Sequence, residues 1–121
     1  MRFLVVDDEA MIAETICDFF EDEGIDTESA TSGEQALSAF TRRPDFDALI
    51  TDIDMPDMSG LVLARRCRQI RPGLPVVVIT GYAAKAFLRP KEPAVVMEKP
   101  FHPRELAEAA AKLVQNPPRG G

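Results

Sequence analysis

Five side chains that are able to do chemistry each stand at the C-terminal end of a short apolar run. They are three carboxylates, one hydroxyl and one ammonium group: Asp7, Asp8, Asp52, Thr80 and Lys99. Carboxylates that converge repel one another and require a cation, and a small set of oxygen ligands favours a hard ion such as Mg²⁺. A carboxylate beside Mg²⁺ and a lysine can also attack phosphorus, because both cations neutralise charge on a transferring phosphoryl group. These residue types therefore predict a cation-dependent site.

Each of these residues also has an ordinary structural interpretation when it is taken alone. Asp7 and Asp8 are compatible with capping the helix that follows them, and Asp52 with a helix cap or a turn. Thr80 is compatible with a plain strand end, and Lys99 with a solvated surface lysine. Their joint occurrence after apolar runs favours one shared site.

Apolar patterns predict the strands and helices that would position these side chains. Continuous apolar runs are typical of buried parallel strands, and a polar extended segment predicts an edge strand. The predicted strands are Phe3–Val6, Asp26–Ala30 (the edge strand), Asp47–Thr51, Val76–Ile79 and Val95–Met97. Helical periodicity and capping signals, including Ser32 with Gln35, predict the helices Ala10–Glu23, Ser32–Arg43, Ser59–Ile70 and Pro103–Val114. Pro90 and Pro93 leave room for one or two further helical turns over residues 83–88.

This alternation predicts an α/β fold with a five-stranded parallel sheet and helices on both faces. Ligands of such sheets bind at the C-terminal ends of the strands, near the switch in strand order, which is where the five side chains would meet. The length of 121 residues fits one domain. We place that domain over residues 1–115 and predict a disordered tail over residues 116–121.

The composition excludes several classes of protein. The chain has 14 Lys and Arg against 20 Asp and Glu, a formal charge of −6, which disfavours direct binding to nucleic acid and suits cations and basic partners. Cys17 and Cys67 have no metal-ligand spacing and are predicted to be buried thiols. The acids at positions 7 to 9 interrupt any signal-peptide apolar region, and no apolar run reaches the roughly 18–20 residues of a membrane span. A cytoplasmic protein is therefore expected.

Four motifs in this order resemble the response-regulator receiver domain of two-component signalling. They follow the first, third, fourth and fifth predicted strands: Asp7-Asp8-Glu9, Thr51-Asp52-Ile53-Asp54-Met55-Pro56, Ile79-Thr80-Gly81 and Lys99-Pro100-Phe101. The resemblance covers about residues 2–115 and implies the flavodoxin-like strand order 2-1-3-4-5. It also implies a phosphoacceptor that takes a phosphoryl group from a phosphohistidine and is not a turnover enzyme, although it loses the phosphate by itself.

The same resemblance implies a role for each site residue. Asp52 would be the phosphoacceptor, and Asp8, Asp7 (through water), Asp52 and the backbone carbonyl of Asp54 would hold Mg²⁺. Thr80 and Lys99 would contact the phosphoryl group, and the Lys99-Pro100 peptide bond would be cis. The donor would be a sensor histidine kinase or a histidine phosphotransfer protein, and phosphorylation would shift an existing equilibrium toward a form that binds an output partner.

The segment between the fourth and fifth predicted strands departs from the common receiver pattern. Val96 stands where many receivers carry an aromatic switch residue, three positions before the lysine. With the Thr80-Gly81 pair, this resembles an atypical subgroup nicknamed FAT GUY, and a short or irregular fourth helix is expected. Tyr82, two residues after Thr80, is compatible with shielding a phosphoryl group from water and equally with an ordinary, half-exposed loop aromatic.

Two other functions are compatible with the sequence. Asp52 and Asp54 form an Asp-x-Asp pair like that of haloacid-dehalogenase-type phosphatases, although that motif normally follows the first strand of a longer chain. A receiver that acts only as a phosphate-independent binding module is the third interpretation. The chain carries no predicted output domain, so it is expected to be a stand-alone receiver or one excised from a longer protein such as a hybrid kinase.

Overall fold

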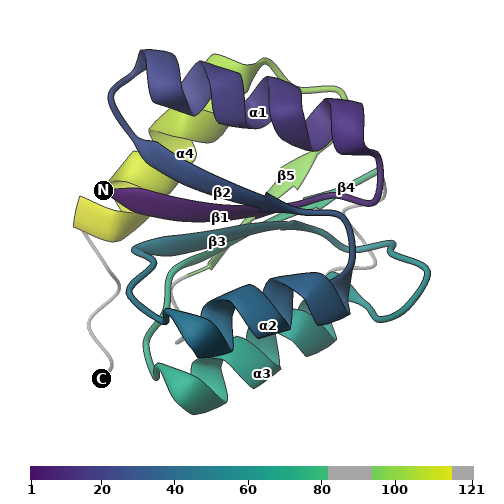
Figure 1. Cartoon of the computed structure of the whole chain (residues 1–121). Helices are drawn as coiled ribbons and strands as arrows, with labels where there is room; N and C mark the ends of the chain where they lie inside the picture. Colours follow the sequence, from purple (N-terminus) through teal and green to yellow (C-terminus); the bar gives the residue numbers. More distant parts are fainter. Residues whose placement is uncertain (82–93, 116–121) are drawn as a thin grey trace.

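The structure of the chain is a computed structural model that describes residues 1–81 and 94–115 (Figure 1). The strands within these ranges are β1 (Arg2–Val6), β2 (Asp26–Ala30), β3 (Ala48–Asp52), β4 (Val76–Thr80) and β5 (Ala94–Glu98). The helices are α1 (Ala10–Asp22), α2 (Gly33–Arg42), α3 (Gly60–Ile70) and α4 (Pro103–Gln115). The predicted helix over residues 83–88, Tyr82 and the predicted tail over residues 116–121 lie outside the described residues.

The five strands form one parallel sheet in the order β2-β1-β3-β4-β5, which confirms the predicted strand order. Helices α1 and α4 cover one face of the sheet, and α2 and α3 cover the other (Figure 1). Every residue of the central strand β3 is buried, as its continuous apolar run predicts. The polar strand β2 lies at the edge of the sheet, where a polar segment can face water.

A separate apolar cluster fills the space on each face of the sheet. Strand β4 shows how the two clusters are divided, because Val76 and Val78 pack with the residues of α2 and α3, whereas Val77 and Ile79 pack with those of α1 and α4. Such continuous burial on both faces requires apolar residues at every strand position rather than at alternate ones. The sheet is therefore held from both sides, and the ends of its strands are fixed relative to one another.

The helix ends show where the predicted capping chemistry holds and where it differs. Ser32 accepts a hydrogen bond from the amide of Gln35 at 3.0 Å, as predicted. The side chain of Gln35 does not return to Ser32, however, but accepts from the amide of Thr31 at 2.6 Å, one residue earlier. Gly24 follows α1 with φ of +81°, a left-handed conformation that glycine adopts readily after the end of a helix.

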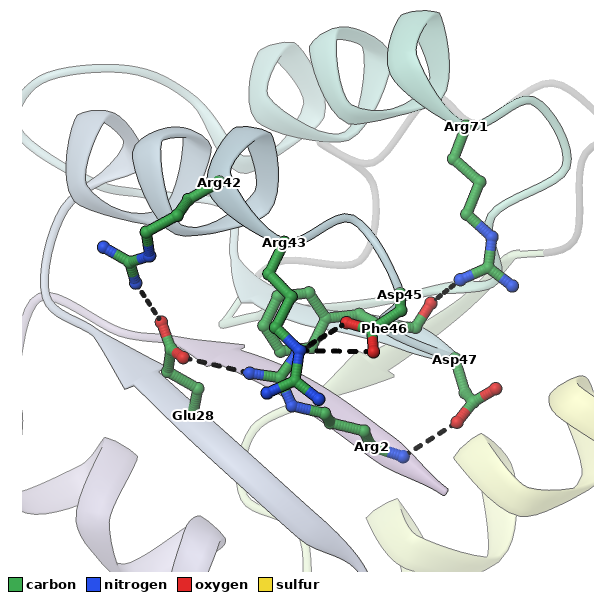
Figure 2. A network of polar contacts seen from close by, with 8 residues as sticks. All are labelled: Arg2, Glu28, Arg42, Arg43, Asp45, Phe46, Asp47 and Arg71. Carbon is green, nitrogen blue, oxygen red and sulfur yellow. Dashed lines mark hydrogen bonds and ion pairs between the residues drawn. The ribbon is translucent and has the colours of Figure 1, made fainter.

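Opposite the predicted site, a group of polar contacts joins the N-terminal ends of β1 and β3 (Figure 2). The guanidinium of Arg2 lies 4.0 Å from the centre of the Phe46 ring and forms ion pairs with Glu28 and Asp45. Its backbone amide donates to the carboxylate of Asp47 at 2.8 Å. Arg71 donates to the carbonyl of Phe46 from the end of α3. These contacts connect β1, β2, the segment before β3 and α3 at one end of the sheet.

The remaining sequence expectations concern thiols and membrane spans. Cys17 and Cys67 are free and buried, as predicted, and burial raises the pKa of the Cys67 thiol to about 12. Among the described helices, none combines the length and the apolar character that a membrane crossing requires.

Candidate functional site

The C-terminal ends of β1 and β3 bring the three predicted carboxylates together. These strands are neighbours in the sheet, with Val6 opposite Thr51, so Asp7 and Asp52 emerge side by side. One oxygen atom from each of Asp7, Asp8 and Asp52 lies within 4.8 Å of the others. Asp7 and Asp52 are 1% and 6% exposed, whereas Asp8 is exposed and leaves the cluster accessible from solvent.

Asp7 carries the clearest sign that this cluster suits a cation. Its Oδ1 accepts a hydrogen bond from the amide of Glu9 at 2.9 Å, whereas its Oδ2 is buried and has no hydrogen-bond partner among the described residues. Burial raises the pKa of Asp7, and the nearby Asp52 and Asp8 raise it further. An unsatisfied carboxylate oxygen beside two other acids fits a hard cation with oxygen ligands, as Mg²⁺ is.

The alternative that Asp7 or Asp8 caps the first helix does not fit the structure. The N-cap residue of α1 is Glu9, and no side chain makes a capping hydrogen bond there. The carboxylate of Asp7 instead receives the Glu9 amide before the helix begins. The two acids are thus free of a role in the helix and are available to the carboxylate cluster.

Lys99 supplies a positive charge on the other side of Asp52. Its Nζ lies 3.5 Å from Oδ2 of Asp52, a distance at which both an ion pair and a weak hydrogen bond form. The Asp52 side chain is 8% exposed and that of Lys99 is 37% exposed. Burial raises the pKa of Asp52, and the charge of Lys99 opposes this effect by favouring the ionised carboxylate. Asp52 is therefore a buried acid with a lysine on one side and two acids on the other.

Thr80 and Asp54 complete the predicted set. Thr80 is fully buried at the end of β4, and its carbonyl accepts the backbone amide of Lys99 at 2.8 Å. Because Asp52 is opposite Ile79 in the sheet, Thr80 stands one residue beyond the level of Asp52 on the adjacent strand. Asp54 is exposed, and its amide makes a long 3.4 Å hydrogen bond to Oδ1 of Asp52. The Lys99-Pro100 bond is cis, as expected.

One residue beside the site was missed by the sequence reasoning. The sequence motifs give Asp57 no role, but its two carboxylate oxygens accept the backbone amides of Gly33 and Glu34 at 3.0 and 2.9 Å. Those amides belong to the first turn of α2, more than twenty residues earlier in the chain. The sequence holds no local signal for such a contact, because it depends on where the fold places α2.

With this geometry in place, comparison with known proteins identifies the family. The family model described as the response regulator receiver domain matches residues 3–111. The chain belongs to this receiver family. Its strand order and the acidic cluster at the C-terminal edge of the sheet agree with that assignment.

Two related receiver proteins illustrate how far the similarity extends. The response regulator receiver protein CpdR of Brucella abortus is 35% identical over 117 residues, which cover 93% of this chain and 96% of CpdR. The response regulator receiver protein Anae109_2439 of an Anaeromyxobacter strain is 41% identical over 83 residues. Those residues cover 69% of this chain but only 34% of that protein, so the chain spans about a third of this longer relative.

Solved receiver structures share the fold. A receiver domain protein from Clostridium thermocellum superimposes with a TM-score of 0.85 at 29% identity, covering 94% of each chain. The receiver domain of the hybrid histidine kinase CckA gives 0.80 at 28% identity, covering 95% of this chain and all of that one. TrrA of Thermotoga maritima, solved with Mg²⁺ and BeF, gives 0.81 at 32% identity and covers 93% of this chain and 97% of that one.

Val96, the position that differs from many receivers, lies within the described part of this receiver. It is half-buried on β5 and stands opposite Val78 of β4. The side chain at this position is thus a small aliphatic one on β5, the strand at the edge of the sheet.

Proposed function

We propose that this receiver accepts a phosphoryl group on Asp52 in the presence of Mg²⁺. The observation that carries the proposal is the convergence of three carboxylate oxygens within 4.8 Å of one another, with the Lys99 ammonium 3.5 Å from Asp52. Asp7, Asp8, Asp52 and the carbonyl of Asp54 would hold the ion, which supplies positive charge that offsets the anionic oxygens of the incoming phosphoryl group.

The residues of the chain define the chemical step. A carboxylate oxygen of Asp52 attacks the phosphorus of a phosphohistidine and forms an acyl phosphate, while the bond between phosphorus and the histidine nitrogen breaks. That nitrogen takes up a proton from solvent and leaves as neutral imidazole. Lys99 contributes charge to the oxygens of the group being transferred, and Thr80 donates a hydrogen bond to one of them. Water later hydrolyses the acyl phosphate, so the protein returns to its starting state without turnover of small substrates.

The donor in this proposal is a histidine kinase or a histidine phosphotransfer protein, and a surface next to the site suits such a protein. A groove between α1 and the start of α4 is lined by Met11, Ile12, Thr15, Ile16, Phe101 and Pro103. Met11, which follows the acidic residues by one helical turn, is 80% exposed. An exposed apolar side chain on the helix that follows Asp7 and Asp8 is a suitable contact for a protein that must bring its histidine to Asp52.

The consequence of phosphorylation in this proposal is altered binding of an output partner, in a stand-alone cytoplasmic receiver or in one that forms part of a larger protein. With valine at position 96, the signal would travel without the aromatic side-chain movement of many receivers. In this proposal the chain belongs with the atypical receivers that lack this switch. A phosphatase that uses Asp52 and Asp54 gains no support from the family match.

The test separates a phosphoacceptor from a hydrolase. Acetyl phosphate with Mg²⁺ should add at most one phosphate per chain, released by hydroxylamine as an acyl phosphate is, and EDTA should prevent the addition. A small monoester such as p-nitrophenyl phosphate should not be turned over. Sustained release of nitrophenol that disappears in Asp52→Asn would favour the hydrolase, and absence of any modification would leave the binding module as the better description.

A further inference from the structure

The loop between β3 and α3 is attached to the start of α2 by the carboxylate of Asp57. Its Oδ1 accepts the amide of Gly33 at 3.0 Å, and its Oδ2 accepts the amide of Glu34 at 2.9 Å. These residues lie 24 and 23 positions away from Asp57 in the sequence. The contact therefore joins two elements that are connected only through the fold.

The chemistry of a helix start explains why this contact is favourable. The first amides of an α-helix have no partner within the helix, and the aligned peptide dipoles favour negative charge at that end. Among the described residues, the Ser32 side chain accepts the amide of Gln35 alone, and Asp57 supplies one oxygen for each of the two preceding amides, those of Gly33 and Glu34. These hydrogen bonds lower the pKa of Asp57, which remains ionised under physiological conditions.

Steric fit holds the same loop in place at two glycines. A Cβ atom at Gly33 would lie 2.2 Å from Cγ of Met58, so a larger residue there would require the Met58 side chain to move. A Cβ atom at Gly60 would lie 2.1 Å from the carbonyl oxygen of Asp52 itself. The loop that follows Asp52 and carries Asp54 therefore packs against the starts of α2 and α3.

We propose that Asp57 is a positioning residue for the Asp52 site and couples the N-terminus of α2 to it. Asp57 stands three residues after Asp54, so its hydrogen bonds to α2 restrict where the Asp54 carbonyl lies relative to the carboxylate cluster. The inference rests on the proposed Mg²⁺ site. Because coupling between two sites is reciprocal, occupation of that site should also steady the first turn of α2.

The experiment compares Asp57→Ala with Ser32→Ala in the full chain. Both substitutions remove a cap from the same end of α2, so their effects on stability in urea should be comparable. Only Asp57→Ala also releases the loop between β3 and α3. Mg²⁺ titration followed by calorimetry should show a dissociation constant about tenfold higher in Asp57→Ala, as for lost outer-shell partners. The dissociation constant of Ser32→Ala should stay within about twofold of the parent value. Asp57→Asn keeps one acceptor oxygen, so its Mg²⁺ dissociation constant should lie between those of Asp57→Ala and Ser32→Ala. This variant preserves the test if Asp57→Ala does not fold.

Amide hydrogen exchange supplies a second readout that loss of a cap alone would not change. Mg²⁺ should slow exchange at Gly33 and Glu34 in the parent and in Ser32→Ala, but not in Asp57→Ala. Equal Mg²⁺ affinity in Asp57→Ala and the parent would overturn the inference while leaving the proposed function intact. Equal weakening in Ser32→Ala would also overturn it, because the effect would then follow helix stability. A parent that binds no Mg²⁺ would overturn both the inference and the proposed function.

Discussion

Asp7 is the residue at which folding and the proposed function conflict most clearly. Its carboxylate is buried beside two other acids, and one of its oxygens has no hydrogen-bond partner in the described structure. Because burial raises its pKa above 3.8, the folded protein holds a proton on Asp7 more tightly than the unfolded chain does. The metal-free protein should therefore lose stability as the pH rises from the pKa of Asp7 in the unfolded chain to its higher pKa in the folded protein.

Neutralising Asp7 should remove this penalty. At pH 7 in EDTA, Asp7→Asn should be more stable than the parent by on the order of 1 kcal/mol, the scale of a buried unsatisfied polar atom. Urea unfolding measures the difference, and Asp18→Asn, which changes an exposed acid on α1, is the matched control with little effect. Saturating Mg²⁺ should stabilise the parent more than Asp7→Asn by mass action. If Asp7→Asn were less stable than the parent in EDTA, or if Mg²⁺ stabilised it as much as the parent, the proposed role of Asp7 would be wrong.

At the scale of elements, the start of α3 is packed directly against the end of β3. Gly60 leaves no room for a side chain, because a Cβ atom there would lie 2.1 Å from the Asp52 carbonyl oxygen. That carbonyl belongs to backbone rather than to a flexible side chain, so the strand end or the helix must move. The position of the Asp52 carboxylate thus depends on how closely α3 approaches.

Gly60→Ala should consequently damage the site as well as the fold. We expect a loss of about 2–3 kcal/mol in urea unfolding and a clear drop in the rate of modification by acetyl phosphate. Gly24→Ala is the control, since φ of +81° makes alanine costly there by about 1–2 kcal/mol although no atom lies within 4 Å. The control should lose stability but keep its modification rate per folded molecule. Equal rates in both variants would show that α3 does not position Asp52.

The opposite end of the sheet is held by Arg2, which lies between Glu28 and Asp45 and over the Phe46 ring (Figure 2). Its side chain is 18% exposed, so its contacts are shielded from water more than ordinary surface ion pairs. Arg2→Ala should cost about 2 kcal/mol of stability, the sum of a cation–π contact and partly buried ion pairs.

Arg43→Ala is the matched control for Arg2, because Arg43 pairs with the same Asp45 while both side chains are mostly exposed. Its cost in urea unfolding should be below about 0.5 kcal/mol. Mg²⁺ affinity should be unchanged in both variants, since these arginines and the carboxylate cluster lie at opposite ends of the strands. Similar costs for Arg2→Ala and Arg43→Ala would mean that the ring contact and burial contribute nothing.

For the whole molecule, the sequence predicted what depends on local pattern. Strand order follows from strand and helix alternation once the family resemblance is included, and strand ends placed Asp7, Asp52 and Lys99 at a common edge. Contacts between distant segments could not be predicted in this way. Asp57 bonds to α2 and Arg2 packs on Phe46 only because the finished fold brings these segments together.

The central claim is that Asp52, and not its neighbour Asp54, accepts the phosphoryl group. The direct measurement is the mass of the intact chain and its peptides after incubation with Mg²⁺ and acetyl phosphate, for the parent, Asp52→Asn and Asp54→Asn. We expect one acyl phosphate on the peptide that contains Asp52 in the parent and in Asp54→Asn, because the proposed function gives the Asp54 side chain no role. We expect none in Asp52→Asn. Modification of Asp52→Asn to the parent level would contradict the account.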